Sequence, residues 1–240
     1  MVRLTITTWN LQGSKGVDAE AVAAHVLERK TDLLLLQEVQ WLQSRRIARA
    51  LDARSSDWAF KHLSANTWPE GLAVIGVTRR VRARATALTR RFELWNWRRR
   101  IMQVVKVDDD LTVVNLHLTA HSGAVEDQER HRELETVVRH LPAGGAALVV
   151  GDFNAKPGSS IFGPLSGAGL VDSWPTAGGE GFTNWARALH SGPANRRLDY
   201  VWASSAVGIV GARVPVAGDD GYERFGVLSD HLPLTVTLDL

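Results

Sequence analysis

Two short apolar runs, each followed within two residues by a carboxylate, constrain the fold of this chain more than any other feature. The leucine run 33–36 precedes Glu38, and the apolar run 146–150 precedes Asp152. Short apolar runs bounded by polar or glycine-containing segments are typical of buried strands. We therefore expect each carboxylate to leave a sheet at its carboxyl edge, which is where open α/β sheets bind their ligands.

A predicted helix precedes each of these two strands, so the two halves of the chain share an outline. Sequence patterns predict helices at about 18–30, 40–52 and 124–140. They predict strands at 2–9, 32–37, 71–77, 81–88, 101–107, 111–118, 146–150, 198–203, 208–215 and 232–239. Two such halves, each a mixed sheet with helices on its outer face, would pack as a four-layered α/β/β/α sandwich.

The chain is expected to form one domain over residues 1–240, because the candidate site residues run from Asn10 to His231. Its apolar content of 45% and charged content of 22% are ordinary for a soluble globular protein. No apolar stretch approaches the roughly 20 residues that cross a bilayer. The N-terminus enters a strand pattern without a cleavable leader, so we expect a cytoplasmic location. No pattern indicates an obligate protein partner.

The absence of cysteine limits the metal chemistry that is open to this chain. Without thiolates, the available ligands are carboxylate, amide and imidazole groups, and disulfides are excluded. Oxygen-rich ligand sets suit hard cations better than structural zinc. Any metal site is therefore expected to bind Mg²⁺, with Mn²⁺ as a possible substitute.

One segment is much more basic than the chain as a whole, whose net charge is only +2. Between residues 79 and 100 there are nine arginines and one acid, Glu93, with Trp95 and Trp97 among them. Arginine pairs with phosphates and indole rings stack on bases, so the segment is a candidate nucleic-acid track. A solvated strand face with no ligand is the alternative that charge patterning leaves open.

Polar residues follow the predicted strands in a characteristic order. The motifs are Trp9-Asn10, Gln37-Glu38, Asn115-Leu116-His117, Gly151-Asp152-Phe153-Asn154, Arg197-Leu198-Asp199 and Ser229-Asp230-His231. This order resembles the endonuclease/exonuclease/phosphatase superfamily over nearly the whole chain. The resemblance implies a four-layered α/β sandwich and Mg²⁺-dependent hydrolysis of phosphoesters.

The same resemblance assigns the metal ligands. Glu38 matches the principal metal ligand of the superfamily, and Mg²⁺ is usually held by one or two carboxylates with several waters. Asn10 and Asp230 match positions that support the metal, its waters or the phosphate. As an isolated residue, Asn10 would be interpreted as a turn residue.

Five further residues match the catalytic positions. Asp152 resembles the group that orients or deprotonates the attacking water, and Asn154 the neighbour that holds water and a phosphate oxygen. His231 and Asp199 resemble a His–Asp pair in which the carboxylate fixes and charges the imidazole. His117 stands where exonuclease III-like enzymes carry Tyr and where the deoxyribonuclease I, sphingomyelinase and deadenylase branches carry His. It is a candidate donor to the departing oxygen.

A phosphodiester-cleaving nuclease acting on DNA or RNA is the function that this pattern favours. Arg98, Arg99, Arg100 and Asn115 are then the candidate substrate contacts. A phospholipid phosphodiesterase or an inositol-phosphate phosphatase is the alternative within the superfamily. An inactive binding or scaffold member is the alternative outside catalysis, although every position that carries the chemistry holds a competent residue.

Overall fold

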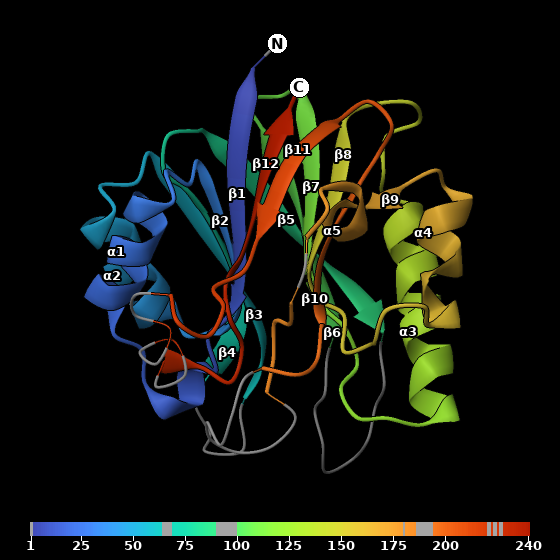
Figure 1. Cartoon of the computed structure of the whole chain (residues 1–240), viewed down its shortest axis with the longest axis horizontal. Coiled ribbons are helices and arrows are strands. Elements are labelled where there is room, and N and C mark those ends of the chain that lie inside the picture. The colour runs from blue at the N-terminus through green and yellow to red at the C-terminus, as the bar shows by residue number, and fades with distance from the viewer. Residues whose placement is uncertain are drawn as a thin grey trace.

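Two six-stranded sheets lie face to face in the computed structural model, which describes residues 2–63, 69–89, 100–179, 181–185, 194–219, 222, 225 and 228–240 (Figure 1). Helices cover the outer face of each sheet: α1 (Ala19–Glu28) and α2 (Trp41–Ala50) lie on one side, and α3 (Ala124–Val138) and α4 (Gly163–Gly167) on the other. Both sheets contain parallel and antiparallel pairs. The predicted four-layered sandwich of two mixed sheets is confirmed.

The first sheet contains both ends of the chain. In its spatial order the strands are β11 (Gly208–Arg213), β12 (Leu234–Asp239), β1 (Arg3–Asn10), β2 (Leu33–Val39), β4 (Pro69–Gly76) and β3 (Ser55–Leu63). β1 and β12 pair antiparallel, so the two termini lie side by side. β1 and β2 pair parallel through the helix α1 (Ala19–Glu28), which brings the ends of both strands to one edge.

The second sheet repeats this arrangement. Its strands, in spatial order, are β5 (Val81–Thr89), β6 (Arg100–Val107), β7 (Leu111–His117), β8 (Ala147–Asp152), β10 (Asp199–Ala203) and β9 (Val171–Asp172). β7 and β8 pair parallel through the helix α3 (Ala124–Val138). His117 and Asp152 are register partners at the ends of these strands. The parallel pair therefore places two candidate catalytic residues next to each other.

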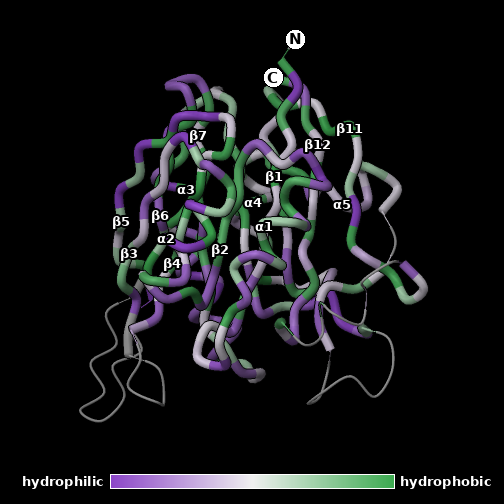
Figure 2. The backbone as a smooth tube through the Cα atoms, turned by 90° about the vertical axis from the view of Figure 1, so that its left-hand side faces the viewer, coloured by the Kyte–Doolittle hydropathy of each residue, from purple (hydrophilic) through white to green (hydrophobic). Residues whose placement is uncertain are grey.

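Two apolar clusters explain why the strands are buried on both faces. Leu33, Leu34, Leu35 and Leu36 are all fully buried because β2 packs between the outer helices and the second sheet. A separate cluster lies between the second sheet and α3 with α4 (Gly163–Gly167). Figure 2 shows hydrophobic stretches along the strands in the interior. Within the described ranges, no helix is long and apolar enough to cross a membrane.

The remaining helical segments are short, apart from one on the first sheet. They are α2 (Trp41–Ala50), α5 (Ser173–Thr176), η1 (Gly13–Lys15) and η2 (Ser160–Phe162). α2 begins three residues after Glu38, so this helix and β2 together determine where Glu38 leaves the sheet.

Asn115 joins the two sheets, and this placement corrects the prediction that it contacts substrate. Its Nδ2 donates to Gln103 Oε1 at 3.1 Å and to the carbonyls of Leu36 and Ala73 at 3.3 and 3.1 Å. Its Oδ1 accepts from Gln37 Nε2 at 2.8 Å. The residue is fully buried, and both ends of its amide are engaged inside the protein. Asn115 therefore has a structural role.

The strands β3 and β9 are absent from the sequence-based predictions. In β3 the buried positions are Ala59 and Lys61, whereas Phe60 between them is exposed. The usual alternation of apolar residues inward and polar residues outward is reversed at this point, so no strand pattern is visible. β9 has only two residues, too few for any periodic pattern.

Candidate functional site

The polar residues at the strand ends converge on one edge, where the two sheets meet. Asn10 ends β1, Glu38 lies near the end of β2, His117 ends β7 and Asp152 ends β8. Asp199 begins β10, and Asp230 and His231 precede β12. The structure therefore brings together residues that are up to 221 positions apart in the sequence, the separation of Asn10 and His231.

Asp152 lies at the centre of this group, and it is 1% exposed. Its Oδ2 accepts a hydrogen bond from Asn10 Nδ2 at 3.1 Å, and its Oδ1 accepts one from the backbone N–H of Asn154 at 2.9 Å. The Nε2 atoms of His117 and His231 lie 3.6 and 3.7 Å from the same Oδ2. Burial raises the pKa of the Asp152 carboxyl, while the charge of His231 opposes that rise.

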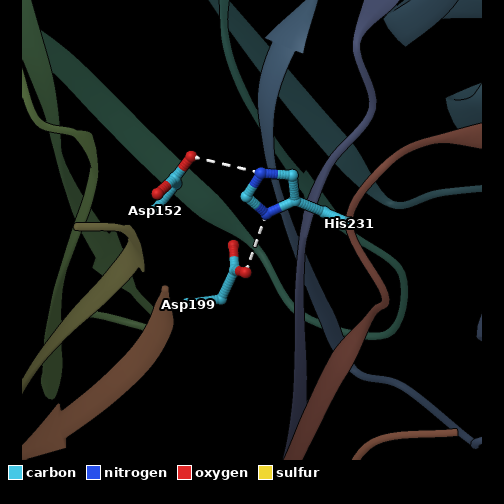
Figure 3. Close-up of side chains that lie close together, drawn as sticks. All are labelled: Asp152, Asp199 and His231. Atoms are coloured by element: carbon cyan, nitrogen blue, oxygen red, sulfur yellow. Dashed lines mark hydrogen bonds and ion pairs between the residues drawn. The ribbon is translucent and has the colours of Figure 1, made fainter. Parts of the chain in front are cut away.

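His231 and Asp199 form a buried pair (Figure 3). His231 Nδ1 is 2.8 Å from Asp199 Oδ2, so Nδ1 donates and Nε2 is turned toward Asp152. Thr183 Oγ1 accepts from the backbone N–H of Asp199 at 3.1 Å and fixes the start of β10. Burial by itself would lower the pKa of His231, but the charges of Asp199 and Asp152 outweigh it and raise the pKa to about 10. The imidazole is therefore held as a cation.

Irregular backbone positions two of the site residues. Glu38 and Asn154 both have φ near +50°, a left-handed conformation that is unusual outside glycine. The register between β2 and β4 shifts between Leu36 and Val39, which is a β-bulge at Glu38. The bulge turns the Glu38 side chain out of the ladder, and its carboxylate is 26% exposed at the edge of the site. Such strained positions occur mainly where the surrounding structure enforces them for function.

The carboxylates of the site could hold a metal ion. Ligand atoms of Asp152, Asp199 and His231 all lie within 4.8 Å of one another. Within the described part of the chain, the Oδ1 atoms of Asp199 and Asp230 are buried without a hydrogen-bond partner. A buried oxygen without a donor is destabilising unless a cation or water satisfies it. The residues present therefore fit a hard cation.

Asp230 and Glu38 suit that cation better than the Asp152, Asp199 and His231 group does. His231 Nδ1 is already engaged by Asp199, and an imidazolium cannot act as a metal ligand. Asp230 Oδ1 lies 4.0 Å from His231 Nε2, and burial, together with the charge of Glu38, raises the pKa of Asp230. These two carboxylates border the same exposed side of the site.

Two buried ionisable residues at the site were not predicted from the sequence. Lys61 Nζ lies 3.0 Å from His117 Nδ1, and Lys61 is 1% exposed. Burial and the charge of Arg100 lower the pKa of Lys61 to about 7. Glu70 is also buried, and burial followed by the charge of Glu38 raises its pKa to about 7. In the sequence, a glutamate followed by glycine at the start of a strand, Glu70-Gly71, was the only sign that either residue belongs to the site, and this sign is weak.

The arginine-rich segment is not one continuous track. Arg79 pairs with Asp108 and Arg82 with Asp109, at the end of β5 that is remote from the site. β5 has nine residues, which corresponds to about 30 Å of extended chain. Arginines at its two ends therefore cannot contact the same phosphates.

At the near end of this segment, Arg100 begins β6 and is buried, with its charge acting on Lys61 and Glu70. The other arginines and both tryptophans of this end lie outside the described residues: Arg90, Arg91, Trp95, Trp97, Arg98 and Arg99. Their predicted contacts with substrate stay predictions.

A basic hollow of about 360 Å³ lies beside Asn154. Arg130, Lys156 and Arg196 line it, together with Asp127. Arg130 Nη2 pairs with Asp127 Oδ1 at 2.5 Å, whereas the Lys156 side chain is exposed. The net charge of these four side chains is positive, so the hollow favours an anionic group next to the site.

Comparison with known proteins gives a consistent picture. The model of the Endonuclease/Exonuclease/phosphatase family matches residues 7–231. No curated protein gives a significant sequence match. An endonuclease/exonuclease/phosphatase from Beutenbergia cavernae is 23% identical, with a TM-score of 0.78, over 100% of this chain and 72% of that one.

Two further solved structures are similar over almost their whole length. An AP endonuclease from Archaeoglobus fulgidus is 16% identical with a TM-score of 0.73, over 99% of this chain and 100% of that one. A mannosyl-6-phosphatase from Bacteroides thetaiotaomicron is 18% identical with a TM-score of 0.69, over the same shares of the two chains. At these identities the likeness concerns the fold.

Proposed function

The chain belongs to the Endonuclease/Exonuclease/phosphatase family, and from that premise we propose that it is a divalent-metal-dependent phosphodiesterase that cleaves nucleic acid. One observation carries the proposal. Two imidazole Nε2 atoms, from His117 and His231, lie 3.6 and 3.7 Å from the same oxygen of the buried Asp152. A carboxylate with a donor on either side is suited to a water attacking phosphorus and to the phosphate itself.

Asp152 is the proposed base that orients or deprotonates the attacking water. Burial raises the pKa of its carboxyl above that of an exposed aspartate, which brings it closer to the working range of a general base. Asn10 Nδ2 and the backbone N–H of Asn154 hold the two carboxylate oxygens in place. The carboxylate is thus already positioned before substrate arrives, which lowers the entropic part of the barrier.

His231, charged by Asp199, is the proposed stabiliser of the phosphate. Negative charge accumulates on the phosphoryl oxygens during hydrolysis, and a fixed cation in a buried site interacts strongly with it. The Asn154 amide, whose Nδ2 also donates to the Leu118 carbonyl at 3.2 Å, is the proposed second donor to a phosphate oxygen. His117 is the proposed donor to the departing oxygen, because its Nε2 approaches Asp152 from β7 of the second sheet, whereas His231 precedes β12 of the first sheet.

Glu38 and Asp230 are the proposed ligands of the cation, with Asn10 as a supporting amide. When bound, Mg²⁺ would neutralise phosphate charge and favour departure of the leaving oxygen. The Nδ2 of Asn10 donates to Asp152, and its Oδ1 accepts from the backbone N–H of Gln12 at 3.1 Å. The second lone pair of that oxygen is the proposed contact with the cation.

Nucleic acid is the proposed substrate because the site has basic surroundings. The hollow lined by Arg130, Lys156 and Arg196 adjoins Asn154, so it could receive a phosphate that flanks the one being cleaved. Arg98 and Arg99 are proposed as further phosphate contacts. Cleavage by in-line attack of water with loss of the 3′ oxygen would leave a 5′-phosphate on the product.

Nicking of supercoiled plasmid in the presence of Mg²⁺ tests the proposal. The native protein is compared with Asp152→Ala and with Asp110→Asn, which removes a carboxylate from an exposed turn, all purified identically. We expect nicking by the native protein and by Asp110→Asn, loss of nicking in Asp152→Ala, and full inhibition by EDTA. Equal nicking by all three proteins would assign the activity to a contaminant and overturn the proposal.

If the native protein does not nick DNA, the assay passes to other phosphoesters. Single-stranded RNA, phospholipid headgroups and inositol phosphates are tested next, followed by sugar monophosphates, since a similar fold occurs in a mannosyl-6-phosphatase. Turnover of any of these with loss in Asp152→Ala would keep the site and change the substrate. No turnover even of a simple aryl phosphodiester would favour an inactive binding member.

A further inference from the structure

Lys61 occupies an unusual position behind the catalytic edge. It lies on β3, the outermost strand of the first sheet, yet it is 1% exposed and points toward β7 of the second sheet. The register between β3 and β4 shifts between Phe60 and His62, so Lys61 is the extra residue of a β-bulge. Ala59 and Lys61 are buried and Phe60 between them is exposed, so Lys61 shares the inward face of β3 with Ala59. A lysine, a residue that is almost never fully buried, therefore lies inside the site.

We propose that Lys61 is a positioning residue that holds His117 as the neutral tautomer protonated at Nε2. The catalytic consequence of this inference rests on the proposed function, whereas the tautomer itself can be observed without any substrate. The evidence is the 3.0 Å contact between Lys61 Nζ and His117 Nδ1.

An ammonium group has hydrogens to donate and no lone pair with which to accept. A hydrogen bond from Lys61 Nζ therefore requires Nδ1 of His117 to be the unprotonated nitrogen. The proton of the neutral ring must then be at Nε2, the atom 3.6 Å from Asp152 Oδ2.

Glu38 is the competing partner of His117 Nδ1, and its Oε1 lies 3.7 Å away. A carboxylate at that position would favour a proton on Nδ1. The lysine contact is shorter by 0.7 Å and has hydrogen-bond length, so it is the interaction expected to determine the tautomer. The Glu38 carboxylate instead attracts the ammonium group of Lys61.

The charges around Lys61 are suited to retaining an ammonium at this depth. Glu38, Glu70 and Asp152 each act to raise the pKa of Lys61, against the opposing effects of burial and Arg100. These groups come from four different strands, β2, β4, β8 and β6. A buried cation is tolerated only when such partners surround it.

The two histidines of the site would then act differently. His231 is backed by the carboxylate of Asp199 and carries a positive charge. His117 is backed by a cation and presents a single neutral N–H from Nε2. The first is suited to stabilising charge on phosphate oxygens, and the second to donating one directed hydrogen bond to the departing oxygen. Lys61 therefore sets the direction of that donor.

Nitrogen NMR of ¹⁵N-histidine-labelled protein tests the tautomer directly. Two-bond ¹H–¹⁵N correlation spectra are recorded without substrate at about pH 6, which lies below the Lys61 pKa of about 7, so that Lys61 is mainly an ammonium. His117→Gln identifies the His117 signals by their disappearance. We expect an unprotonated Nδ1 and a protonated Nε2 for His117. A protonated Nδ1 would overturn the inference, whether or not the protein proves to be a nuclease.

Lys61→Met provides the second test, with Lys106→Met as the matched control. Lys106 lies on β6 and donates to Thr112 Oγ1 at 2.8 Å, away from the site. Its replacement by Met therefore removes one lysine charge, as Lys61→Met does, without touching the site. In Lys61→Met the His117 nitrogen signals should shift toward a mixture of tautomers, and in Lys106→Met they should stay as in the native protein. Unchanged signals in Lys61→Met would contradict the inference. If Lys61→Met fails to fold by circular dichroism, the spectrum of the native protein still decides.

Kinetics then test whether Lys61 acts through His117. On a phosphodiester that the native protein cleaves, Lys61→Met should lower kcat by about 10²-fold with little change in KM. The double variant Lys61→Met/His117→Gln should be no slower than His117→Gln alone. Rate losses that multiply would show that Lys61 acts independently of His117 and would refute the positioning role.

Discussion

Replacing Asn115 by Ala should destabilise the protein without weakening its affinity for substrate. The change removes four hydrogen bonds: three reach the first sheet, at Gln37, Leu36 and Ala73, and one reaches Gln103 on the neighbouring strand β6. It also leaves Gln103 Oε1 buried without this donor. At about 1 kcal/mol for each buried hydrogen bond, the free energy of unfolding should fall by roughly 3–4 kcal/mol. This is a large part of the 5–15 kcal/mol that is typical of a folded domain.

Urea unfolding followed by tryptophan fluorescence measures this change, and the chain has nine tryptophans to report it. For a chain of this size the midpoint should fall by roughly 1 M. Asn115→Asp should lose at least as much, because a buried carboxylate cannot replace the two N–H donors. An Asn115→Ala variant with an unchanged midpoint and a raised KM would refute the structural role and restore Asn115 as a substrate contact.

Asn154→Gly is the control for that experiment. Asn154 also carries an amide, but its Nδ2 makes one hydrogen bond, to the carbonyl of Leu118 at 3.2 Å. Glycine tolerates the φ of 50° at this position, so the substitution adds no backbone strain. We expect a loss of about 1 kcal/mol in stability and a large loss of rate. The two asparagines should thus separate stability from catalysis.

Asp199→Asn should lower the pKa of His231, which is about 10 in the native protein, and so move the expected alkaline limit of activity to lower pH in a pH–rate profile. The pKa of His231 is about 10 in the folded protein and 6.5 in an ordinary histidine, so its proton stabilises the fold fully below pH 6.5, and this stabilisation is lost as the pH rises to about 10. The difference in urea midpoint between the native protein and Asp199→Asn should therefore be larger at pH 6.5 than at pH 10, and equal differences would contradict the reasoning. Gly151→Ala should lower the free energy of unfolding by roughly 3 kcal/mol or prevent folding, since a Cβ would lie 2.0 Å from the Leu116 carbonyl oxygen at a φ of 137°. A near-native thermal midpoint would show that this contact relaxes. Glu38→Gln should weaken Mn²⁺ binding by about 10-fold or more in calorimetric titration, whereas undiminished affinity would place the metal on other ligands.

Much of the fold could be predicted because its central strands are buried on both faces. Such strands need continuous apolar sequence, which made β2 and β8 visible as short runs. The layer arrangement followed from the helices that precede them. β9 could not be predicted, because two residues contain no periodic signal. Asn115 was misassigned because a polar residue inside a strand next to a catalytic histidine suggests a ligand contact. The contacts that occupy it come from three other strands, β2, β4 and β6.

The convergence of the candidate site residues on one edge could be predicted from the sequence, but their geometry could not. Each motif lies at a strand end, and the parallel pairs bring strand ends to a common edge. The sequence order alone therefore indicated that Asp152, His231 and Asp199 belong together. The approach of both imidazole Nε2 atoms to one oxygen of Asp152 depends on the distance and angle between the two sheets, which no local pattern records. The distance and angle between the two sheets follow from side-chain packing between their facing surfaces.

Lys61 shows most clearly where a local pattern has to fail. Its burial is possible only because Glu38 and Glu70 supply negative charge from other strands. The neighbouring Phe60 is exposed, at a position where the usual alternation of a half-buried strand would place a polar residue. Burying an ammonium is unfavourable by several kcal/mol unless it is compensated, so a strand selected for stability alone would have the opposite alternation. A reversed pattern beside a candidate catalytic histidine is therefore expected where function constrains the strand, and it can be recognised only once the partner strands are known.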